Sequence, residues 1–402
     1  MSPTIRRLVL KRFKSAPSAS VELDNPTFLV GHNGSGKSNI LSALSFLSDV
    51  MSLPLQAVFD AEGGITAVRN RSASRGYPPN LGFGVHFGKI NNGIASARYA
   101  FEVKALKNYG FQVIREQCVV QLDNGRRRWF DRSKESLRSS ERGMEPSLEP
   151  TALALPLIGG TPSFAPVAKA LSSIRVYSIE THTIREMQDP DSGASLKRDG
   201  SNASSVLREI ERNSPEDIER ICEILHSVVP NTTAVKTKKH GNKLSLEFTQ
   251  SWGAEDSLRF ESFSMSDGTL RALGLLLAVY QRPTPTLIAI EEPEATIHPG
   301  ALPAVLDLIR HASKRMQVVV TTHSPDVLDA DWLEDRHIRI VEWSDGATRI
   351  AGLADSTRSA LQRHLMGAGE LLRSNALEPE QLFTAEPQAS QSQMDLFEGI
   401  DG

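Results

Sequence analysis

The stretch Gly31-His32-Asn33-Gly34-Ser35-Gly36-Lys37-Ser38 fits the pattern G-x-x-x-x-G-K-[ST]. Residues 27–30 before it are expected to form a short buried strand, and apolar residues at positions 40, 41, 44 and 47 predict a helix after it. Glycines in this context let backbone N–H groups converge on phosphates, and the helix N-terminus adds partial positive charge. Lys37 would reach the β- and γ-phosphates, and the Ser38 hydroxyl would ligate Mg²⁺. An ordinary glycine-rich turn is the alternative, but the flanking elements favour a nucleotide site.

The composition is that of an ordinary soluble globular protein and narrows the function classes. Of the 402 residues, 40% are apolar and 23% are charged, and the formal net charge is −3. This charge excludes a global basic field for nucleic acid, so any such contact would be local. Two cysteines, Cys118 and Cys222, lie far apart and indicate neither a disulfide framework nor a zinc site. The longest apolar run, 273–280, is too short to span a bilayer, so we expect a cytoplasmic protein without membrane contact.

A second group of motifs begins near residue 263. Ser266-Asp267-Gly268 precedes a predicted helix over 270–281, whose N-terminus would offer an anion site, although an N-cap alone also explains the pattern. The apolar strand predicted over 286–290 ends in Glu291-Glu292, which is how P-loop enzymes hold magnesium and position water. We expect Glu291 to bind Mg²⁺ and Glu292 to polarise the attacking water. His323 follows another predicted strand, 317–321, and is placed to hydrogen-bond the γ-phosphate.

The order of these motifs resembles that of ABC-type P-loop ATPases, most closely the RecF and SMC branch. Three segments, Leu196–Asn202, Ser266–Leu273 and Glu291–Pro299, resemble the compact bacterial AAA_21 (AbiEii-type) predicted ATPases, which are often linked to phage defence. The likeness spans about residues 4–375. It implies an α/β fold of the ABC-ATPase head type, with a mainly parallel core sheet, an antiparallel β subdomain and a helical lobe.

The resemblance also implies how the chain is divided and which residues touch the ligands. We expect one ATPase head over 1–375 and a disordered tail over 376–402, with the head made of five parts at 1–50, 51–180, 181–262, 263–355 and a closing helix within 356–375. The expected cofactors are ATP and Mg²⁺. The expected catalytic residues are Glu292, His323 and Lys37, and the expected metal ligands are Ser38 and Glu291. The expected nucleotide contacts are Gly31, Asn33, Gly34, Ser35, Gly36, Lys37, Ser38 and Asn39, with Ser266, Asp267 and Gly268 acting from a second subunit of an ATP-dependent homodimer.

Three departures from the family pattern bear on this expectation. Asp267 stands where transporters usually have glycine, Glu291 stands where the first acid is usually Asp, and no coiled coil interrupts residues 51–262. The glutamine that usually joins the two lobes is not identified by the sequence, and Gln188 is only a candidate.

Two segments outside the ATPase motifs suggest partners. Arg126, Arg127, Arg128 and Arg132 lie beside two aromatic residues and could contact DNA, although a solvated hairpin is the commoner origin of such a run. In the tail, Gln393-Met394-Asp395-Leu396-Phe397 resembles the short peptide by which bacterial replication and repair proteins dock on the DNA sliding clamp, and a chance match is the alternative.

The sequence therefore predicts an ATPase that dimerises on ATP and gates a partner, such as a nuclease or other effector, in DNA repair or anti-phage defence. Two rival hypotheses stay open. One is a non-hydrolysing, nucleotide-dependent scaffold or antitoxin-like regulator, and the other, less favoured, is the ATP subunit of a transporter.

Overall fold

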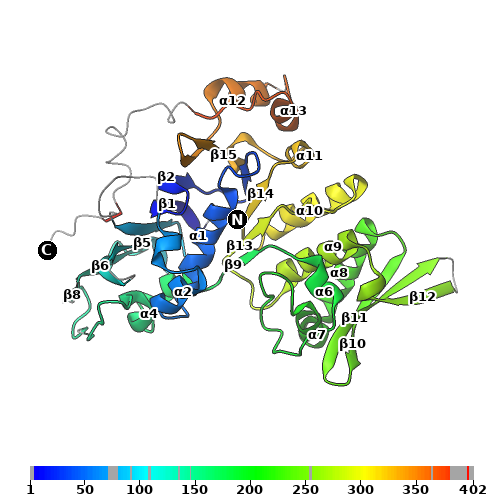
Figure 1. Cartoon of the computed structure of the whole chain (residues 1–402), viewed down its shortest axis with the longest axis horizontal. Coiled ribbons are helices and arrows are strands. Elements are labelled where there is room, and N and C mark those ends of the chain that lie inside the picture. Colours follow the sequence, from blue (N-terminus) through cyan, green and yellow to red (C-terminus); the bar gives the residue numbers. More distant parts are fainter. Residues whose placement is uncertain are drawn as a thin grey trace. The chain divides into compact units, whose positions relative to one another are not determined.

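A computed structural model describes residues 4–70, 80–90, 93–106, 110–134, 136–144, 146–252, 256–363, 365–380 and 396–397. The chain forms two compact units (Figure 1). The first unit comprises Met1–Ile174, Glu334–Met366 and Leu371–Gly402, and the second comprises Arg175–Leu333 and Gly367–Glu370.

The first unit is built on a seven-stranded antiparallel sheet in the order β2-β1-β4-β5-β6-β7-β8. Its core face is lined by the alternate large side chains that period-two patterning predicts. Phe83 of β4 stacks on Phe46 of helix α1 at 4.8 Å between ring centroids, and Phe13 meets both rings edge-on. This aromatic cluster fixes α1 against the sheet, so it positions the glycine loop that precedes α1.

The strands of the first unit are β1 (Ile5–Phe13), β2 (Ala16–Glu22), β3 (Thr27–Val30), β4 (Leu81–Phe87), β5 (Ile94–Ala105), β6 (Phe111–Leu122), β7 (Arg127–Ser133), β8 (Ser136–Ser139), β15 (Ile338–Ser344) and β16 (Ala347–Ala351). Strand β15 pairs parallel to β3 and antiparallel to β16. The helices are α1 (Lys37–Asp49), α2 (Leu55–Ala61), α3 (Ile65–Val68), α4 (Ala154–Ile158), α5 (Ala165–Ser172) and α12 (Asp355–Gln362), with the 3₁₀ turn η4 (Asp335–His337).

The second unit contains a helical group, a small antiparallel sheet in the order β10-β11-β12, and a parallel pair of strands, β13 and β14. Its strands are β9 (Ile174–Tyr177), which starts at the last residue of the first unit, β10 (Thr232–His240), β11 (Lys243–Trp252), β12 (Asp256–Glu261), β13 (Leu287–Glu291) and β14 (Gln317–Thr322). Its helices are α6 (Thr181–Arg185), α7 (Ala203–Asn213), α8 (Pro215–Val228), α9 (Asp267–Tyr280), α10 (Leu302–Ala312) and α11 (Pro325–Leu328), with 3₁₀ turns η2 (Ser262–Ser264) and η3 (Pro299–Ala301). Figure 1 shows β10 to β12 extending from the side of α7 and α8 (green).

The parallel pairs, the antiparallel sheet and the helical group confirm the predicted fold class. The buried strand before the glycine loop and the helix after it also lie where the sequence places them, as β3 and α1. Helix α9 is almost entirely buried from Thr269 to Tyr280, which explains its apolar sequence.

The C-terminal part departs from the prediction in two respects. The single closing helix is instead two short helices, α12 (Asp355–Gln362) and α13 (Ala368–Arg373). Gly367 and Gly369 flank the start of α13, and glycine is a poor helix former, so one continuous helix is disfavoured.

The tail is not disordered throughout, contrary to the expectation for 376–402. Glu380 N donates to Gly352 O at 3.0 Å, and Pro379 forms a β-bridge with Leu353. Further along, Leu396 is buried with only 3% of its surface exposed. Residues 381–395 and 398–402, including Gln393, Met394 and Asp395 of the clamp-like peptide, lie outside the described residues.

Candidate functional site

The glycine loop of the first unit has the geometry of a phosphate cradle. Gly34 and Gly36 have φ of 81° and 103°, in the left-handed region that glycine adopts at no steric cost. A Cβ at Gly36 would collide with Thr348, and one at Gly31 would collide with the carbonyl oxygen of Val341, so side chains are excluded at both positions. The loop therefore needs glycine for backbone shape and for close packing alike.

Lys37, the lysine of the motif, is held by the loop itself. Its Nζ donates to Gly31 O at 2.6 Å and to His32 O at 3.0 Å, so the side chain folds back under the loop. Only 5% of Lys37 is exposed, whereas Ser38 at the start of α1 is exposed. Ser35 is also buried, and its Oγ has no hydrogen-bond partner within the described ranges. A buried ammonium, an orphan hydroxyl and a helix N-terminus together fit a phosphate group.

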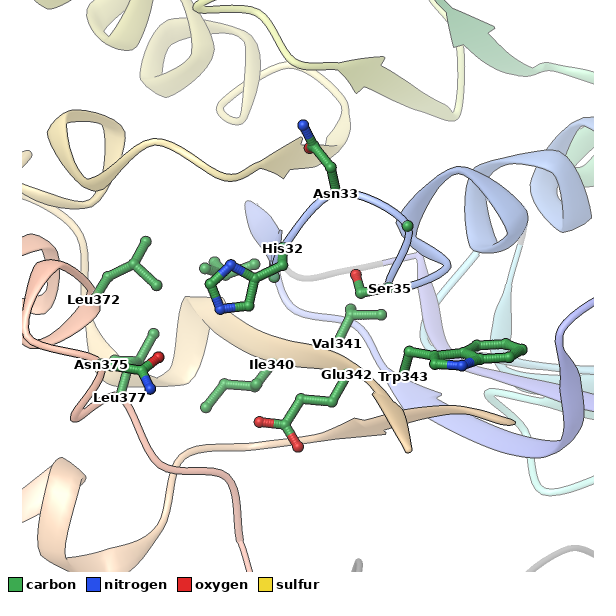
Figure 2. A pocket seen from close by; sticks show the side chains of 13 residues that line it. His32, Asn33, Ser35, Ile340, Val341, Glu342, Trp343, Leu372, Asn375 and Leu377 are labelled. Carbon is green, nitrogen blue, oxygen red and sulfur yellow. The ribbon is translucent and has the colours of Figure 1, made fainter. Parts of the chain in front are cut away.

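A cavity of about 520 Å³ lies along the first half of the loop, within the size range of small-molecule sites. Residues 30–35 form one wall and residues 340–343 of β15 form another. Figure 2 shows the His32 ring between the loop and Asn375 of the C-terminal segment. Of the other predicted contacts, Asn33 is exposed on this wall, while the side-chain amide of Asn39 donates to Ser15 Oγ at 2.5 Å.

In the second unit, the parallel register of β13 and β14 brings the acids and the histidine together. Glu291 pairs with Thr321, so the carboxyl ends of the two strands lie side by side. His323 Nδ1 lies 3.1 Å from Glu292 Oε1, and the two side chains are 45% and 31% exposed. The structure thus places the predicted water-orienting acid and the predicted phosphate contact next to each other at one strand edge.

The backbone at Glu292 adopts a strained conformation. Its φ is 44°, a left-handed conformation that costs a non-glycine residue free energy and tends to occur at functional sites. The turn is held by Arg271 of α9, whose Nη2 donates to the carbonyl oxygens of Glu291 at 2.9 Å and Glu292 at 2.7 Å. Burial lowers the pKa of Arg271, and the neighbouring carboxylates of Glu294, Glu292 and Glu291 oppose that shift.

Glu294 completes the acidic turn, which we define as residues 291–294. Its Oε1 accepts a hydrogen bond from Thr322 Oγ1 at 2.5 Å, but its Oε2 is buried with no partner among the residues that the structure describes. Burial raises the pKa of Glu294, and the Thr322 hydrogen bond opposes the shift. A buried carboxylate oxygen without a partner among the described residues, beside the partly exposed side chains of Glu292 and His323, makes this turn a candidate site for another group.

The Ser266 turn is a well-formed helix cap that also lines a cavity. Ser266 Oγ accepts from Thr269 N at 3.2 Å, as the N-cap interpretation predicts. Arg185 Nη2 donates to Asp267 Oδ1 at 2.6 Å, and hydrogen bonds from Thr181 and Arg185 lower the pKa of Asp267. Ser266, Asp267 and Gly268 line a cavity of about 620 Å³ together with residues 227–230, 296–298, 300 and 301. The capping role and an anion-binding role therefore both remain compatible with this turn.

The lobe-joining glutamine is not identified by the structure either. Gln188 is 4% exposed, and its amide donates to Thr183 O at 2.9 Å and Gly200 O at 3.1 Å. Its Oε1 accepts from Ser204 N at 2.8 Å. Both polar atoms of the side chain are therefore bonded within the protein, which gives Gln188 a structural role.

The basic cluster proposed for DNA contact needs one correction. Arg132 has none of its surface exposed, because its position on β7 shares a face with buried Phe130. Its Nε donates to Lys134 O at 2.6 Å, its Nη2 donates to Glu149 O at 2.8 Å, and its Nη1 donates to Ala152 O. Arg132 is therefore a structural residue, whereas Arg126 and Arg127 are exposed and Arg128 is partly exposed.

Arg132 belongs to a buried charge network that we call the Glu116 cluster, formed by Glu116, Arg132 and Tyr99. All three side chains are fully buried, and Arg132 Nη1 lies 3.7 Å from Glu116 Oε2. The Glu116 carboxylate accepts from the backbone N–H groups of Ala154 at 2.5 Å and Leu155 at 2.8 Å and from Tyr99 Oη at 2.9 Å. Burial raises the pKa of Glu116, and these donors oppose the shift.

The residues fit ATP with Mg²⁺. The ligands expected from the protein are one hydroxyl and one carboxylate, with the remaining positions filled by phosphate oxygens and water. No cluster of three or more His, Cys, Asp or Glu side chains able to hold a metal occurs within the described part of the chain. Sequence reasoning missed Arg271, Glu294 and Thr322. The sequence offered one signal for Arg271, because it is the single arginine in the otherwise apolar run of α9.

The phosphate loop, the acidic turn and the fold define a P-loop ATPase of the ABC type, of the SMC- and RecF-like kind. The chain belongs to the family described as "AAA domain, putative AbiEii toxin, Type IV TA system", whose model matches residues 27–150 and 164–329. Comparison with curated proteins gave no match.

Solved structures of SMC heads share the fold. An SMC head bound to the C-terminal winged-helix domain of ScpA matches with a TM-score of 0.55 and 18% identity, covering 90% of this chain and 100% of that chain. An SMC head with an extended coiled coil bound to the C-terminal domain of ScpA, from Pyrococcus furiosus, matches with a TM-score of 0.54 and 16% identity, covering 90% and 99%. None of the helices in the described ranges is long and apolar enough to cross a membrane.

Proposed function

We propose that this protein binds and hydrolyses ATP and uses the nucleotide to control its association with a second copy of itself and with a partner protein. The observation that carries the proposal is the contact between Glu292 and His323, 3.1 Å apart at the carboxyl ends of two parallel strands. Such a pair, partly exposed beside a buried unsatisfied carboxylate, is suited to orient a water molecule for attack on a phosphoryl group.

The proposed mechanism is positioning and electrostatic stabilisation by this chain's own residues. Lys37 and the backbone amides of the glycine loop would bind the phosphates, and Glu292 would orient the attacking water. His323 would donate a hydrogen bond to the γ-phosphate. Ser38 and Glu291 would hold Mg²⁺, which would neutralise charge on the phosphates. The fixed left-handed turn at Glu292 supports this role, because a preorganised carboxylate does not need to reorient during the reaction.

We further propose an ATP-dependent homodimer in which Ser266, Asp267 and Gly268 face the nucleotide of the other subunit. The two solved SMC heads described above are complexes with a domain of ScpA, which supports a separate partner protein for this chain also. Its biological setting would be DNA repair or anti-phage defence in the cytoplasm, with a nuclease or other effector as the partner. Direct DNA contact would fall to Arg126, Arg127 and Arg128, and a sliding clamp would be contacted through 393–397.

The test is steady-state turnover of the purified chain and of Glu292→Gln. Removing the carboxylate should lower ATP turnover by about 10²–10⁴-fold while ATP binding persists, because the general base is lost but the phosphate cradle is intact. Lys37→Ala should instead lose ATP binding. Glu223→Gln, on the exposed side of α8, is the matched control and should turn over ATP as the wild type does.

Two outcomes would contradict the proposal. Unchanged turnover in Glu292→Gln would remove that residue from the mechanism. A wild-type chain that binds ATP but shows no turnover would favour the rival hypothesis of a non-hydrolysing regulator.

A further inference from the structure

The outer face of strand β4 carries a trough made by two glycines. Side chains alternate along β4, so Leu81, Phe83 and Val85 face the core, while Gly82 and Gly84 face the other way. In register, Gly84 lies between Val9 of β1 and Ala100 of β5. Because glycine has no side chain, the central strand is recessed relative to both of its neighbours at these positions.

An ion pair spans the trough at the position of Gly82. Lys11 and Glu102 flank Gly82 in the register of β1, β4 and β5. Lys11 Nζ lies 2.6 Å from Glu102 Oε1, so the two side chains meet from the neighbouring strands. The result is a narrow apolar recess with a charged rim, of the kind that binds a small number of apolar side chains.

Leu396, far along the chain, occupies this recess. It is 3% exposed and forms a buried cluster with Val9 and Ala100. A Cβ at Gly82 would collide with Leu396 Cδ1, and one at Gly84 would lie 3.0 Å from Leu396 Cδ2. The space for the leucine therefore exists because positions 82 and 84 are glycine.

Phe397 continues the contact on the neighbouring strands. It packs against the same cluster, and the Arg115 guanidinium carbon lies 4.4 Å from its ring centroid, within cation–π range. Arg115 is itself held by Asp131, with Nη2 3.2 Å from Oδ2. An apolar recess followed by an oriented guanidinium is specific for two adjacent side chains, an aliphatic one and then an aromatic one.

We propose that this trough is a docking site for the Leu396–Phe397 pair, and that docking withholds the pair from other proteins. The site is occupied by the chain's own tail, so any partner that binds the same two side chains must displace them first. This competition rests on the partner contact proposed above for 393–397, whereas the docking itself does not.

The tether favours the intramolecular contact. Only residues 381–395 separate Glu380 from Leu396. A short linker gives a tethered group an effective concentration in the millimolar range. A free peptide with the same sequence should therefore not bind the trough of the wild-type chain. It should bind only when the chain's own tail cannot dock.

The main experiment measures binding of a fluorescently labelled peptide of residues 388–402 to full-length proteins. Binding should be at least about tenfold tighter to the double variant Leu396→Asp with Phe397→Ala than to the wild type, because the trough is then free. Adding Gly82→Val to that double variant should abolish binding, since the new side chain fills the recess. Leu365→Asp, at a leucine that is 69% exposed, is the matched control and should exclude the peptide as the wild type does.

A second measurement tests docking within the unmodified tail. Chymotrypsin cleavage after Phe397 should be at least about tenfold faster in full-length Gly82→Val than in the wild type, because an undocked tail is accessible. Valine is a good strand former, so the circular dichroism spectrum should be unchanged. If Gly82→Val fails to fold, Gly84→Val and a peptide carrying Leu396→Asp, which should not bind, take its place.

Equal peptide binding to the wild type and to the double variant would overturn the proposal, as would no binding to the double variant at about 1 mM peptide. Failure of the same peptide to bind a purified sliding clamp would remove that partner and leave the docking site intact.

Discussion

The Glu116 cluster and the acidic turn both remove charged side chains from water, but they differ in how those charges are satisfied. In the Glu116 cluster, a fully buried carboxylate receives two backbone N–H groups and a tyrosine hydroxyl, and Arg132 donates to three backbone carbonyls. In the acidic turn, Glu294 Oε2 has no partner in the described ranges, and Glu292 and His323 are partly exposed.

We interpret the Glu116 cluster as structural and the acidic turn as a place where a ligand would supply the missing partner. Buried charges are tolerated when their hydrogen-bonding capacity is filled from within the protein, which is the case for Glu116. A buried carboxylate oxygen without a hydrogen-bond partner costs stability. Such oxygens tend to occur where a ligand supplies the missing partner. Burial raises the pKa of Glu116 and of Glu294 alike, so the pKa direction does not distinguish the two sites. The number of hydrogen-bond donors that each carboxylate receives does distinguish the two sites.

The largest effect on stability should come from the saturated cluster. Arg132→Met keeps much of the side-chain volume but leaves Glu116 and three backbone carbonyls without the cation. We expect the free energy of unfolding to fall by about 3–5 kcal/mol, measured by urea denaturation. Arg126→Met, at an exposed position before β7, is the control and should change it by less than about 0.5 kcal/mol. A loss below about 1 kcal/mol for Arg132→Met would mean that the cluster is not a structural unit.

A smaller effect is expected from the hydroxyl that donates to the Glu294 carboxylate in the acidic turn. Thr322→Val removes the hydroxyl that donates to Glu294 at 2.5 Å while keeping the branched shape. Because the whole carboxylate would then lack a side-chain donor, the free energy of unfolding should fall by about 1–3 kcal/mol. Thr233→Val, at an exposed position on β10, is the control. No change for Thr322→Val would show that water already satisfies Glu294.

The smallest effect concerns pH. Since burial raises the pKa of Glu294, the folded chain binds this proton more tightly than the unfolded chain does. Its contribution to stability should therefore decrease as pH rises from the unfolded value of about 4.3 through the raised folded pKa. Glu294→Gln lacks this titration, so its unfolding free energy relative to the wild type should increase with pH over that window. Parallel pH profiles for the two proteins would contradict the raised pKa.

Much of this comparison was available from the sequence. The glycine loop, the strand that ends in Glu291-Glu292 and the strand before His323 each carry a local pattern, and the structure confirms the elements on which they lie. Parallel pairing of β13 with β14 then brings Glu292 and His323 together, because the carboxyl ends of neighbouring parallel strands lie at the same edge of the sheet. The catalytic and ligand-binding roles of these residues remain predictions.

What the sequence did not reveal depends on contacts between distant segments. Arg132 looked like part of a basic surface run, although strict alternation with Phe130 on β7 would have placed it on the buried face. The partners of Glu294 and Arg271 come from other strands and helices, so no local pattern predicts them. The recess for Leu396 requires the register of three strands, which is set by the whole sheet.

The left-handed backbone at Glu292 has a consequence for engineering. Glycine adopts this conformation without cost, so a procedure that ranks substitutions by stability alone would favour glycine there. The same change would delete the carboxylate proposed to orient water. At position 292, selection for stability and selection for turnover therefore favour different residues. A thermostabilised version of this protein should keep the glutamate despite its unfavourable backbone conformation.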